Sequence, residues 1–305
     1  MQHVPVLLEE SLKYLVTEED GKYFDGTMGF GGHSSALLNK VSPNAVLIGT
    51  DKDKQAFQYL KNKFIDDKRV KLYNTGFTDI DIISKIEFID NFDGILVDLG
   101  VSSFQLDDPN SGFTYREDAP LDLRMDKEKG ISAAVVLTKF APEELTEILF
   151  KYGEEKNARK IVRAIVESRN SKTISTTKDL REIIEPIVPQ RFLNKSLSRV
   201  FQALRIYVND ELEELKIFLK KAVDLLSTDG RIVVISFHSL EDRIVKEVFK
   251  YESLSCVCPP EAPICVCDKE QRLKILTRKP VVPTDIEIKN NKRSRSAKLR
   301  AAQKI

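Results

Sequence analysis

The sequence lacks any long hydrophobic run, and this absence limits where the protein is expected to act. Its 305 residues contain no stretch of about 18 apolar side chains, so we expect no membrane span. The first eleven residues carry acids and no basic segment, which argues against a secretory signal. We therefore expect a cytoplasmic protein with no membrane partner.

The sequence also lacks stretches dominated by one polar residue type, which argues against a largely disordered chain. Hydrophobic residues make up 42% of the chain and charged residues 31%, a composition typical of a globular protein with a sizeable core. The length is that of one large domain or of two smaller ones.

Cysteine is scarce, and all four cysteines lie close together in the sequence. They form two C-x-C pairs, Cys256 with Cys258 and Cys265 with Cys267. In a cytoplasmic protein disulfides are not expected, and four thiols could instead hold a structural zinc ion. However, the C-x-C spacing is tighter than that of common zinc sites, and the segment between the pairs contains three prolines. The sequence therefore favours a surface loop with reduced thiols over a metal site.

The net charge of +1 conceals an uneven distribution along the chain. Counting Lys and Arg against Asp and Glu, residues 1–150 carry −10, residues 151–205 carry +7, residues 206–288 carry −3 and residues 289–305 carry +7. Two basic segments on an acidic body suit binding to a polyanion such as nucleic acid. The alternative is a solvated helical face and a frayed basic tail, and composition alone favours the frayed tail for residues 289–305.

Short apolar segments alternate with helical patterns in the first hundred residues. We expect helices at 7–16 and 55–64 and strands at 22–25, 45–50, 70–73 and 92–97. Near-continuous apolar strands separated by helices are typical of a parallel sheet covered on both faces. The predicted fold class is therefore α/β, with a Rossmann-like, doubly wound sheet.

A long gap separates the fourth strand from the next one. More than 130 residues lie between Asp98 and the strand expected at 231–237, which follows a helix at 210–226. A strand–helix–strand crossover needs only about 30 residues. The gap itself shows helical spacing at 132–140, 142–152, 155–169, 177–184 and 196–208. We therefore expect a discontinuous domain, residues 1–106 and 206–305, interrupted by a helical substrate-recognition domain at 107–205.

A glycine-rich loop follows the first expected strand. Residues 25–33 read DGTMGFGGH, and glycines allow positive φ angles and close approach of a ligand to the backbone. Asp51, at the end of the second strand, is placed to accept hydrogen bonds from both ribose hydroxyls of a nucleoside. Loop and acid together predict NAD, FAD or S-adenosylmethionine as ligand. The alternative role of Asp51 is to cap the helix that follows it.

Further polar residues are expected at the same edge of the sheet. Asp98 follows the fourth strand, where ligands bind in open α/β folds, and could contact a cofactor or a substrate amine. Ser236 lies at the end of the fifth strand and His238 directly after it, although a lone histidine is as often structural. Residues 109–126 mix turn formers with aromatics and arginines, which can stack a base and bind phosphate.

These segments together resemble the ribosomal RNA small-subunit methyltransferase H family, also called MraW. The resemblance covers nearly the whole chain and rests on DGTMGFGGHS at 25–34, DLGVSSFQLDD at 98–108, LDLRMD at 121–126, SFHSLEDRIVK at 236–246 and RSRSAKLR at 293–300. It implies a class I methyltransferase sheet with an inserted helical domain, and S-adenosylmethionine as cofactor. Position by position, it implies cofactor contacts from Gly31, Gly32, His33, Asp51, Phe77, Asp98 and Gln105.

The resemblance also implies the reaction and the substrate. The protein would methylate the N4 amine of a cytosine in the decoding region of small-subunit (16S) ribosomal RNA, presented in the assembled subunit. Candidates to hold that amine are Asp98, Asp122, Ser236 and His238, which the sequence does not rank. Tyr115 or Phe113 could stack the base. The remaining candidates for RNA binding are Arg116, Arg124, Arg293 and Arg295, and a homodimer stays open.

Two other classes of function fit parts of the pattern. A nucleotide-dependent oxidoreductase could use the same sheet, but it needs a hydride-transfer site of which the sequence shows no sign. A non-catalytic RNA-binding assembly factor could use the basic segments equally well, but it has no need of a cofactor loop. Within the methyltransferase hypothesis, only the family resemblance selects ribosomal RNA over DNA or protein.

Overall fold

A computed structural model describes residues 5–101, 112–115, 117–259 and 264–305. The chain divides into two compact units, one formed by Met1–Gly100 with Leu212–Ile305 and the other by Val101–Glu211. The sequence had placed these boundaries near residues 106 and 206, a few residues away. Within the described ranges, no helix combines the length and the apolar character needed to cross a membrane.

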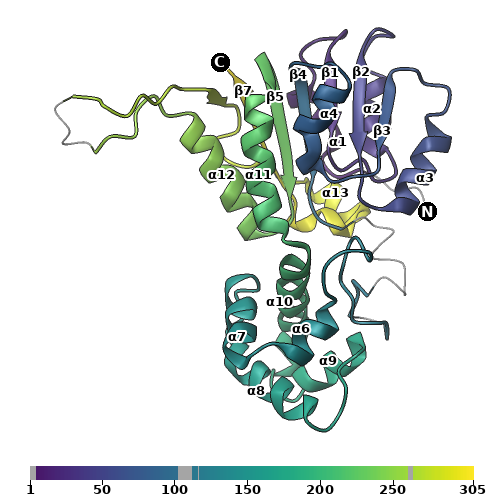
Figure 1. Cartoon of the computed structure of the whole chain (residues 1–305), viewed down its shortest axis with the longest axis vertical. Coiled ribbons are helices and arrows are strands. Elements are labelled where there is room, and N and C mark those ends of the chain that lie inside the picture. Colours follow the sequence, from purple (N-terminus) through teal and green to yellow (C-terminus); the bar gives the residue numbers. More distant parts are fainter. Residues whose placement is uncertain (1–4, 102–111, 116, 260–263) are drawn as a thin grey trace. The chain divides into compact units, whose positions relative to one another are not determined.

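The first unit is built on a seven-stranded sheet (Figure 1). Its strands are ordered β3-β2-β1-β4-β5-β7-β6. The strands comprise β1 (Lys22–Asp25), β2 (Val46–Thr50), β3 (Val70–Tyr73), β4 (Phe92–Asp98), β5 (Leu226–Ser236), β6 (Leu273–Ile275) and β7 (Lys298–Lys304). The first five strands run parallel, and β7 pairs antiparallel with both neighbours. The predicted doubly wound parallel sheet is thereby confirmed.

Helices cover both faces of this sheet, as the apolar strands predicted. In β5, Ile232 and Val234 pack into one core while Val233 and Ile235 pack into the other, because successive side chains of a strand point to opposite faces. One face is covered by α1 (Leu8–Leu15), α2 (Gly32–Leu38) and α3 (Lys54–Lys63). The opposite face is covered by α4 (Ile80–Ile86), α11 (Glu211–Asp224) and α12 (Ser239–Glu252).

The basic C-terminal segment is ordered, which corrects the expectation of a frayed tail. After the short helices α13 (Asp285–Asn290) and η2 (Lys292–Ser296), β7 lies in the sheet between β5 and β6. Leu299 and Ala301 are fully buried in it. The Nε of Arg300 donates to the Asp242 carboxylate over 2.6 Å, so this buried charge is paired. Local composition could not reveal a strand whose partner residues lie from 27 to 72 positions away in the chain.

The second unit is helical, as predicted for the insertion. It contains α6 (Ala133–Lys139), α7 (Pro142–Lys151), α8 (Ala158–Arg169), α9 (Thr177–Ile184) and α10 (Gln190–Asn209). These helices share a hydrophobic core of their own, to which Val136, Ile148, Ile161, Leu180 and Leu197 all contribute. Helix α10 begins six residues before the expected start at 196. The unit therefore has the main property of an independent domain, a separate apolar interior.

Candidate functional site

The candidate site of the first unit lies where the strand order of the sheet reverses. The chain continues from β1 through α2 to β2, which lies on one side of β1. Strand β4 lies on the other side of β1 and pairs in turn with β5. The loops after β1 and β4 therefore diverge, and the crevice between such loops is the usual ligand site of an open α/β sheet. Asp25 ends β1, Asp98 ends β4, and Asp51 directly follows β2.

The loop after β1 takes a shape that depends on glycine at several positions. Gly29 and Gly31 have φ angles of 54° and 72°, the left-handed region that other residues rarely adopt. A Cβ atom on Gly26 would lie 2.7 Å from both Phe77 and Val97, so this position has no room for a larger residue. The loop backbone is thus tightly held against its neighbours.

Asp51 holds this loop by hydrogen bonds and is not a helix cap. Its Oδ2 accepts from the backbone N–H of Gly29 over 2.7 Å, and its Oδ1 accepts from that of Asp53 over 2.8 Å. The cap of α3 is Asp53, whose Oδ1 accepts from the N–H groups of Gln55 and Ala56. The alternative of Asp51 as cap is therefore wrong. Each Asp51 oxygen keeps a lone pair for a further donor.

Phe77 places a half-buried aromatic ring beside the glycine loop. It begins the short helix η1 (Phe77–Asp79) after β3. Its ring packs edge-on against Phe218, with 5.0 Å between centroids, and the Lys52 ammonium lies 6.0 Å from its centroid. Lys52 is itself paired with Glu214 at 2.5 Å. The ring is thus fixed from two sides, which suits a surface for a flat ligand group.

Asp98 presents a buried oxygen with no hydrogen-bond donor among the described residues. The unpartnered atom is Oδ1, while Oδ2 lies 3.9 Å from Nδ1 of His33, too far for a hydrogen bond. Burial, and then the carboxylates of Asp25 and Glu241, hold the pKa of Asp98 well above its usual range. A buried acceptor without a donor is costly, and a ligand N–H group would satisfy it.

The carboxylates of this region share an acidic environment that the sequence did not reveal. Burial raises the pKa of Asp25 to about 6, although Ser34 Oγ donates to it over 2.6 Å. Burial also raises the pKa of Asp51 to about 6, with smaller contributions from Asp53 and Asp25. Because each charge disfavours its neighbours, a cationic ligand would stabilise the group. Asp25 was missed as a functional residue, and its place at the head of the glycine motif was the available signal.

Gly32 and His33 are the first residues of helix α2, directly after the glycine-rich loop. Gly32 packs against Pro5, since a Cβ there would lie 2.5 Å from the proline ring. His33 is buried, and its Nε2 lies 3.0 Å from the carbonyl oxygen of Val6. With that nitrogen donating, Nδ1 is the atom turned toward Asp98. The cofactor contacts expected from Gly31, Gly32 and His33 stay predictions.

Ser236 and His238 lie at the end of β5, and each side chain already makes one hydrogen bond within the protein. The Ser236 hydroxyl is buried and donates to the carbonyl oxygen of Lys298 in β7 over 3.3 Å. His238 is the N-cap of α12, where its Nδ1 accepts from the N–H of Glu241 over 3.4 Å. Its Nε2 lies 3.2 Å from Oε1 of Glu241 without hydrogen-bond geometry. These contacts stabilise strand pairing and the helix start.

The candidates in the second unit are likewise engaged there. Asp122 and Arg124 form a two-pronged ion pair, Nε to Oδ1 over 2.6 Å and Nη2 to Oδ2 over 3.0 Å, and the carboxylate raises the pKa of Arg124. The Tyr115 hydroxyl lies 2.8 Å from that of Ser198. Phe113 is buried in the core, so base stacking by Phe113 is not supported.

The remaining candidates divide between the exposed surface and positions outside the described residues. Arg293 and Arg295 lie in η2 with exposed side chains, where phosphate could reach them. Gln105 and Arg116 lie outside the described ranges. Among the predicted residues, the structure therefore brings the glycine loop, Asp51, Phe77 and Asp98 to one edge of one sheet.

Comparison with known proteins shows which proteins this chain resembles. A family model described as the MraW methylase family matches residues 1–305. Proteins named ribosomal RNA small subunit methyltransferase H are similar over the whole chain. That of Caldicellulosiruptor saccharolyticus is 51% identical, covering 100% of this chain and 99% of the relative. That of Caldicellulosiruptor bescii is 48% identical with the same coverage, and that of Fusobacterium nucleatum is 45% identical over 99% and 97% of the two chains.

Proposed function

Because the chain belongs to the MraW methylase family, we propose that it transfers a methyl group from S-adenosylmethionine to the N4 amine of a cytosine in small-subunit (16S) ribosomal RNA. The fold is the class I, Rossmann-like sheet that the family resemblance predicted. The relatives' names support ribosomal RNA as substrate. The cytosine amine, the decoding region and presentation in the assembled small subunit, in the cytoplasm, belong to the proposal.

The residues gathered at this edge of the sheet fit S-adenosylmethionine. The lone pairs left on Asp51 suit the two ribose hydroxyls, and the Phe77 ring suits the adenine. Gly26, Gly29 and Gly31 keep side chains out of the loop, so that backbone and ligand can come close. The surplus of carboxylates suits a ligand that carries an ammonium group and a sulfonium centre. When bound, this cofactor supplies an electrophilic methyl group, and the chemistry requires no metal.

Asp98 is the residue we assign to the substrate amine. The observation that carries the assignment is its Oδ1, which has no hydrogen-bond donor among the described residues. The N4 lone pair of cytosine is delocalised into the ring, so the amine is a weak nucleophile. A carboxylate that accepts a hydrogen bond from the N–H₂ group localises that lone pair and orients the nitrogen. Asp122 and Ser236 rank below Asp98 because their side chains already have protein partners. The buried Nε2 of His238 also lacks a hydrogen-bond partner among the described residues. Because Nδ1 of this ring accepts the N–H of Glu241, Nε2 carries the proton and cannot accept from the substrate amine.

In this proposal, arginine side chains of each unit contribute to RNA binding. Arg293 and Arg295, which are exposed in η2, contact phosphates, as does Arg116 in the second unit, while Tyr115 stacks a base. Arg124 ranks below them because its guanidinium already donates to Asp122. Phosphate contacts of this kind carry little sequence information and make binding depend on salt. The target base itself must leave its stack to reach the sheet edge.

The experiment that tests the function is methyl transfer from radiolabelled S-adenosylmethionine to small ribosomal subunits that lack their native methyl groups. Nuclease digestion and mass spectrometry then identify the modified nucleoside. We expect label at one position as N4-methylcytidine. If subunits and free ribosomal RNA both stay unlabelled while the protein binds S-adenosylmethionine, the substrate assignment fails and the cofactor assignment stands.

A further inference from the structure

The segment between α12 and β6, of which residues 253–259 and 264–272 are described, forms a long excursion from the first unit (Figure 1). Its base is clamped by Arg272, whose guanidinium donates twice to Glu252 over 2.7 Å and once to Asp224 over 2.5 Å. All four cysteines of the chain lie within this excursion. The cofactor site uses none of them, so their convergence needs a separate explanation.

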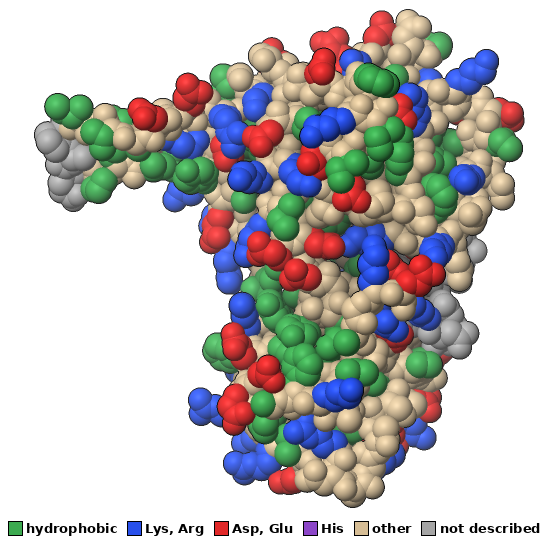
Figure 2. Space-filling model, in the orientation of Figure 1, with side chains coloured by type: hydrophobic (Ala, Val, Ile, Leu, Met, Phe, Trp, Pro, Cys, Tyr) green, Lys and Arg blue, Asp and Glu red, His purple; other side chains and the backbone are tan. Residues whose placement is uncertain are grey.

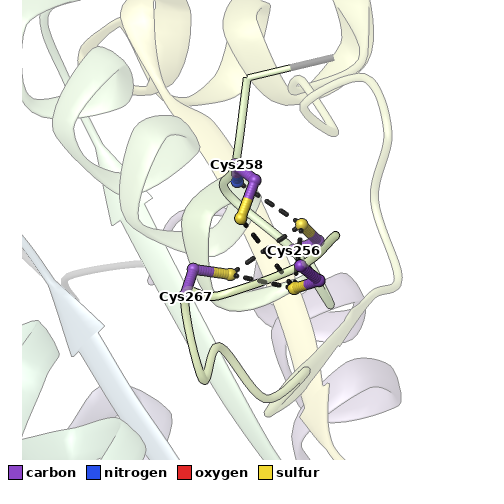
Figure 3. Close-up of side chains that lie close together, drawn as sticks. Cys256, Cys258 and Cys267 are labelled. Carbon is purple, nitrogen blue, oxygen red and sulfur yellow. Dashed lines mark hydrogen bonds between the residues drawn. The ribbon is translucent and has the colours of Figure 1, made fainter. Parts of the chain in front are cut away.

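The four sulfur atoms face one another (Figure 3) and all lie within 4.8 Å of each other. Cys265 is 3.5 Å from Cys256, 3.9 Å from Cys258 and 3.6 Å from Cys267, and the Cys256–Cys267 distance is 3.8 Å. A disulfide would bring two sulfurs to about 2.0 Å, so these are free thiols. Four sulfurs placed tetrahedrally about 2.3 Å from a central Zn²⁺ lie roughly 3.8 Å apart, close to the distances observed.

Backbone amides point at three of the sulfurs and link the two C-x-C pairs. The N–H of Val257 donates to Cys267 and that of Val266 donates to Cys258, both over 3.4 Å. The N–H of Cys258 donates to Cys256 over the same distance. Hydrogen bonds to sulfur favour the thiolate form, which is the form that binds metal. The tight spacing that argued against a metal site thus brings all four sulfurs together.

This part of the excursion has little apolar packing to hold it in place. Val257, Ile264 and Val266 have 44%, 74% and 81% of their surfaces exposed. Figure 2 shows hydrophobic side chains on the surface of this excursion. Small structures without a sufficient core are commonly held by disulfides or a metal ion. Since the thiols are not paired, a metal ion is the remaining device.

We propose that Cys256, Cys258, Cys265 and Cys267 bind one Zn²⁺ ion in a closed, structural site. Four protein sulfurs leave no open position on the metal, so the ion takes no part in methyl transfer. Its role is to hold the two C-x-C pairs together at the end of the excursion, while the Arg272 ion pairs hold its base.

The test is the metal content of the full-length protein, purified without a histidine tag and without chelators, under reducing conditions. We expect one zinc ion per chain by elemental mass spectrometry. The double variant C256S/C258S should retain less than about a tenth of an ion, since two thiolates cannot replace a four-ligand site. The matched control V257S/V266S introduces the same number of hydroxyls between the ligands and should keep its zinc. S-adenosylmethionine binding by each variant reports on folding of the first unit.

A second measurement does not depend on any variant. Replacing zinc with Co²⁺ in the wild-type protein should produce the visible bands of a tetrahedral cobalt–thiolate complex, and this signal can come only from these four cysteines. The proposal is overturned by an intact mass showing disulfides in the purified protein, by iron in place of zinc, or by zinc that persists in C256S/C258S.

Discussion

At the residue scale, Asp51 and Asp53 stand two positions apart and have different partners. Asp51 accepts from the glycine loop, whereas Asp53 caps α3. We expect Asp51→Ala to weaken S-adenosylmethionine binding at least tenfold, a loss of about 1.4 kcal/mol or more, as measured by calorimetry. Asp53→Ala is the control, because loss of a cap costs about 1 kcal/mol of stability and leaves affinity unchanged. Equal affinity in wild type and Asp51→Ala would remove Asp51 from the ribose contact.

The raised pKa of Asp51, about 6, predicts the pH dependence of cofactor binding. A ribose hydroxyl donates to the ionised carboxylate, so affinity should approach its full value at about one pH unit above the pKa and should fall as pH drops through the pKa. The fall is at most about tenfold per pH unit. Asp25 has a similarly raised pKa, and the comparison isolates Asp51: the Asp51→Ala variant should lose part of the slope. An identical pH profile in the two proteins would contradict this.

The same shifts have the opposite consequence for folding. A carboxyl group whose pKa is higher in the folded than in the unfolded state contributes stability that is full below its unfolded pKa. That contribution is lost as pH rises through the folded value. Burial of Asp25 and Asp51 therefore lowers the free energy of unfolding as pH rises from about 4, the usual pKa, to about 6, the pKa in the folded protein. At neutral pH the full cost is present. The site keeps ionisable groups there at a cost in stability.

Asp98 is predicted to affect the methyl-transfer step more than cofactor binding. Asp98→Asn keeps the size of the side chain but replaces an acceptor oxygen with a donor. We expect the rate of methyl transfer to fall by about 10²–10³-fold, the usual effect of losing one positioned hydrogen bond at a reacting centre, with cofactor affinity changed only a few-fold. The control is Asp93→Asn at the start of the same strand. A parallel loss of cofactor affinity would instead make Asp98 a cofactor contact.

At the scale of elements, β7 places the C-terminal residues 298–304 inside the sheet, where they should contribute to stability. Leu299 is fully buried and pairs with Ile235 of β5. Leu299→Ala should lower the free energy of unfolding of the first unit by about 2–5 kcal/mol, measured by chemical denaturation.

Arg295→Ala is the matched control for β7, because its side chain is exposed in the neighbouring η2. Its effect on stability should stay within about 0.5 kcal/mol, while affinity for ribosomal RNA should fall and lose part of its salt dependence. A Leu299→Ala protein as stable as wild type would show that residues 298–304 are not required in the sheet.

Helix α12 shows how one element can use residues that the sequence offers as catalytic candidates. His238 accepts from the N–H of Glu241, and the Glu241 carboxylate accepts in turn from the N–H of His238 over 3.4 Å. This reciprocal arrangement is a capping box. It explains a histidine and an acid three residues apart without catalysis.

At the scale of the whole molecule, the two units have separate hydrophobic cores. We expect calorimetry to show two unfolding transitions, of which S-adenosylmethionine raises only that of the sheet unit, since a ligand stabilises the unit that binds it. Leu197→Ala, in the core of the helical unit, should lower the other transition. One transition that shifts as a whole with the cofactor would show that the units unfold together.

The sequence by itself determined the strands β1 to β4, the long helical insertion, the glycine loop and the family. These features depend on local patterns: apolar periodicity, glycine at sharp turns, and short motifs that can be read directly from the sequence. Asp51 could be singled out because its distance from the loop along the chain is characteristic of nucleoside-binding sheets.

Only the tertiary structure decided which of several equally polar residues meet which partners. It separated Asp51 from the helix cap Asp53, buried Asp25, and left Asp98 Oδ1 with no donor in the described part of the chain. It also drew the basic C-terminus into the sheet as β7 and brought two C-x-C pairs face to face. Strand pairing, burial and the convergence of side chains are long-range contacts, and their free energies depend on neighbours that are distant in the chain.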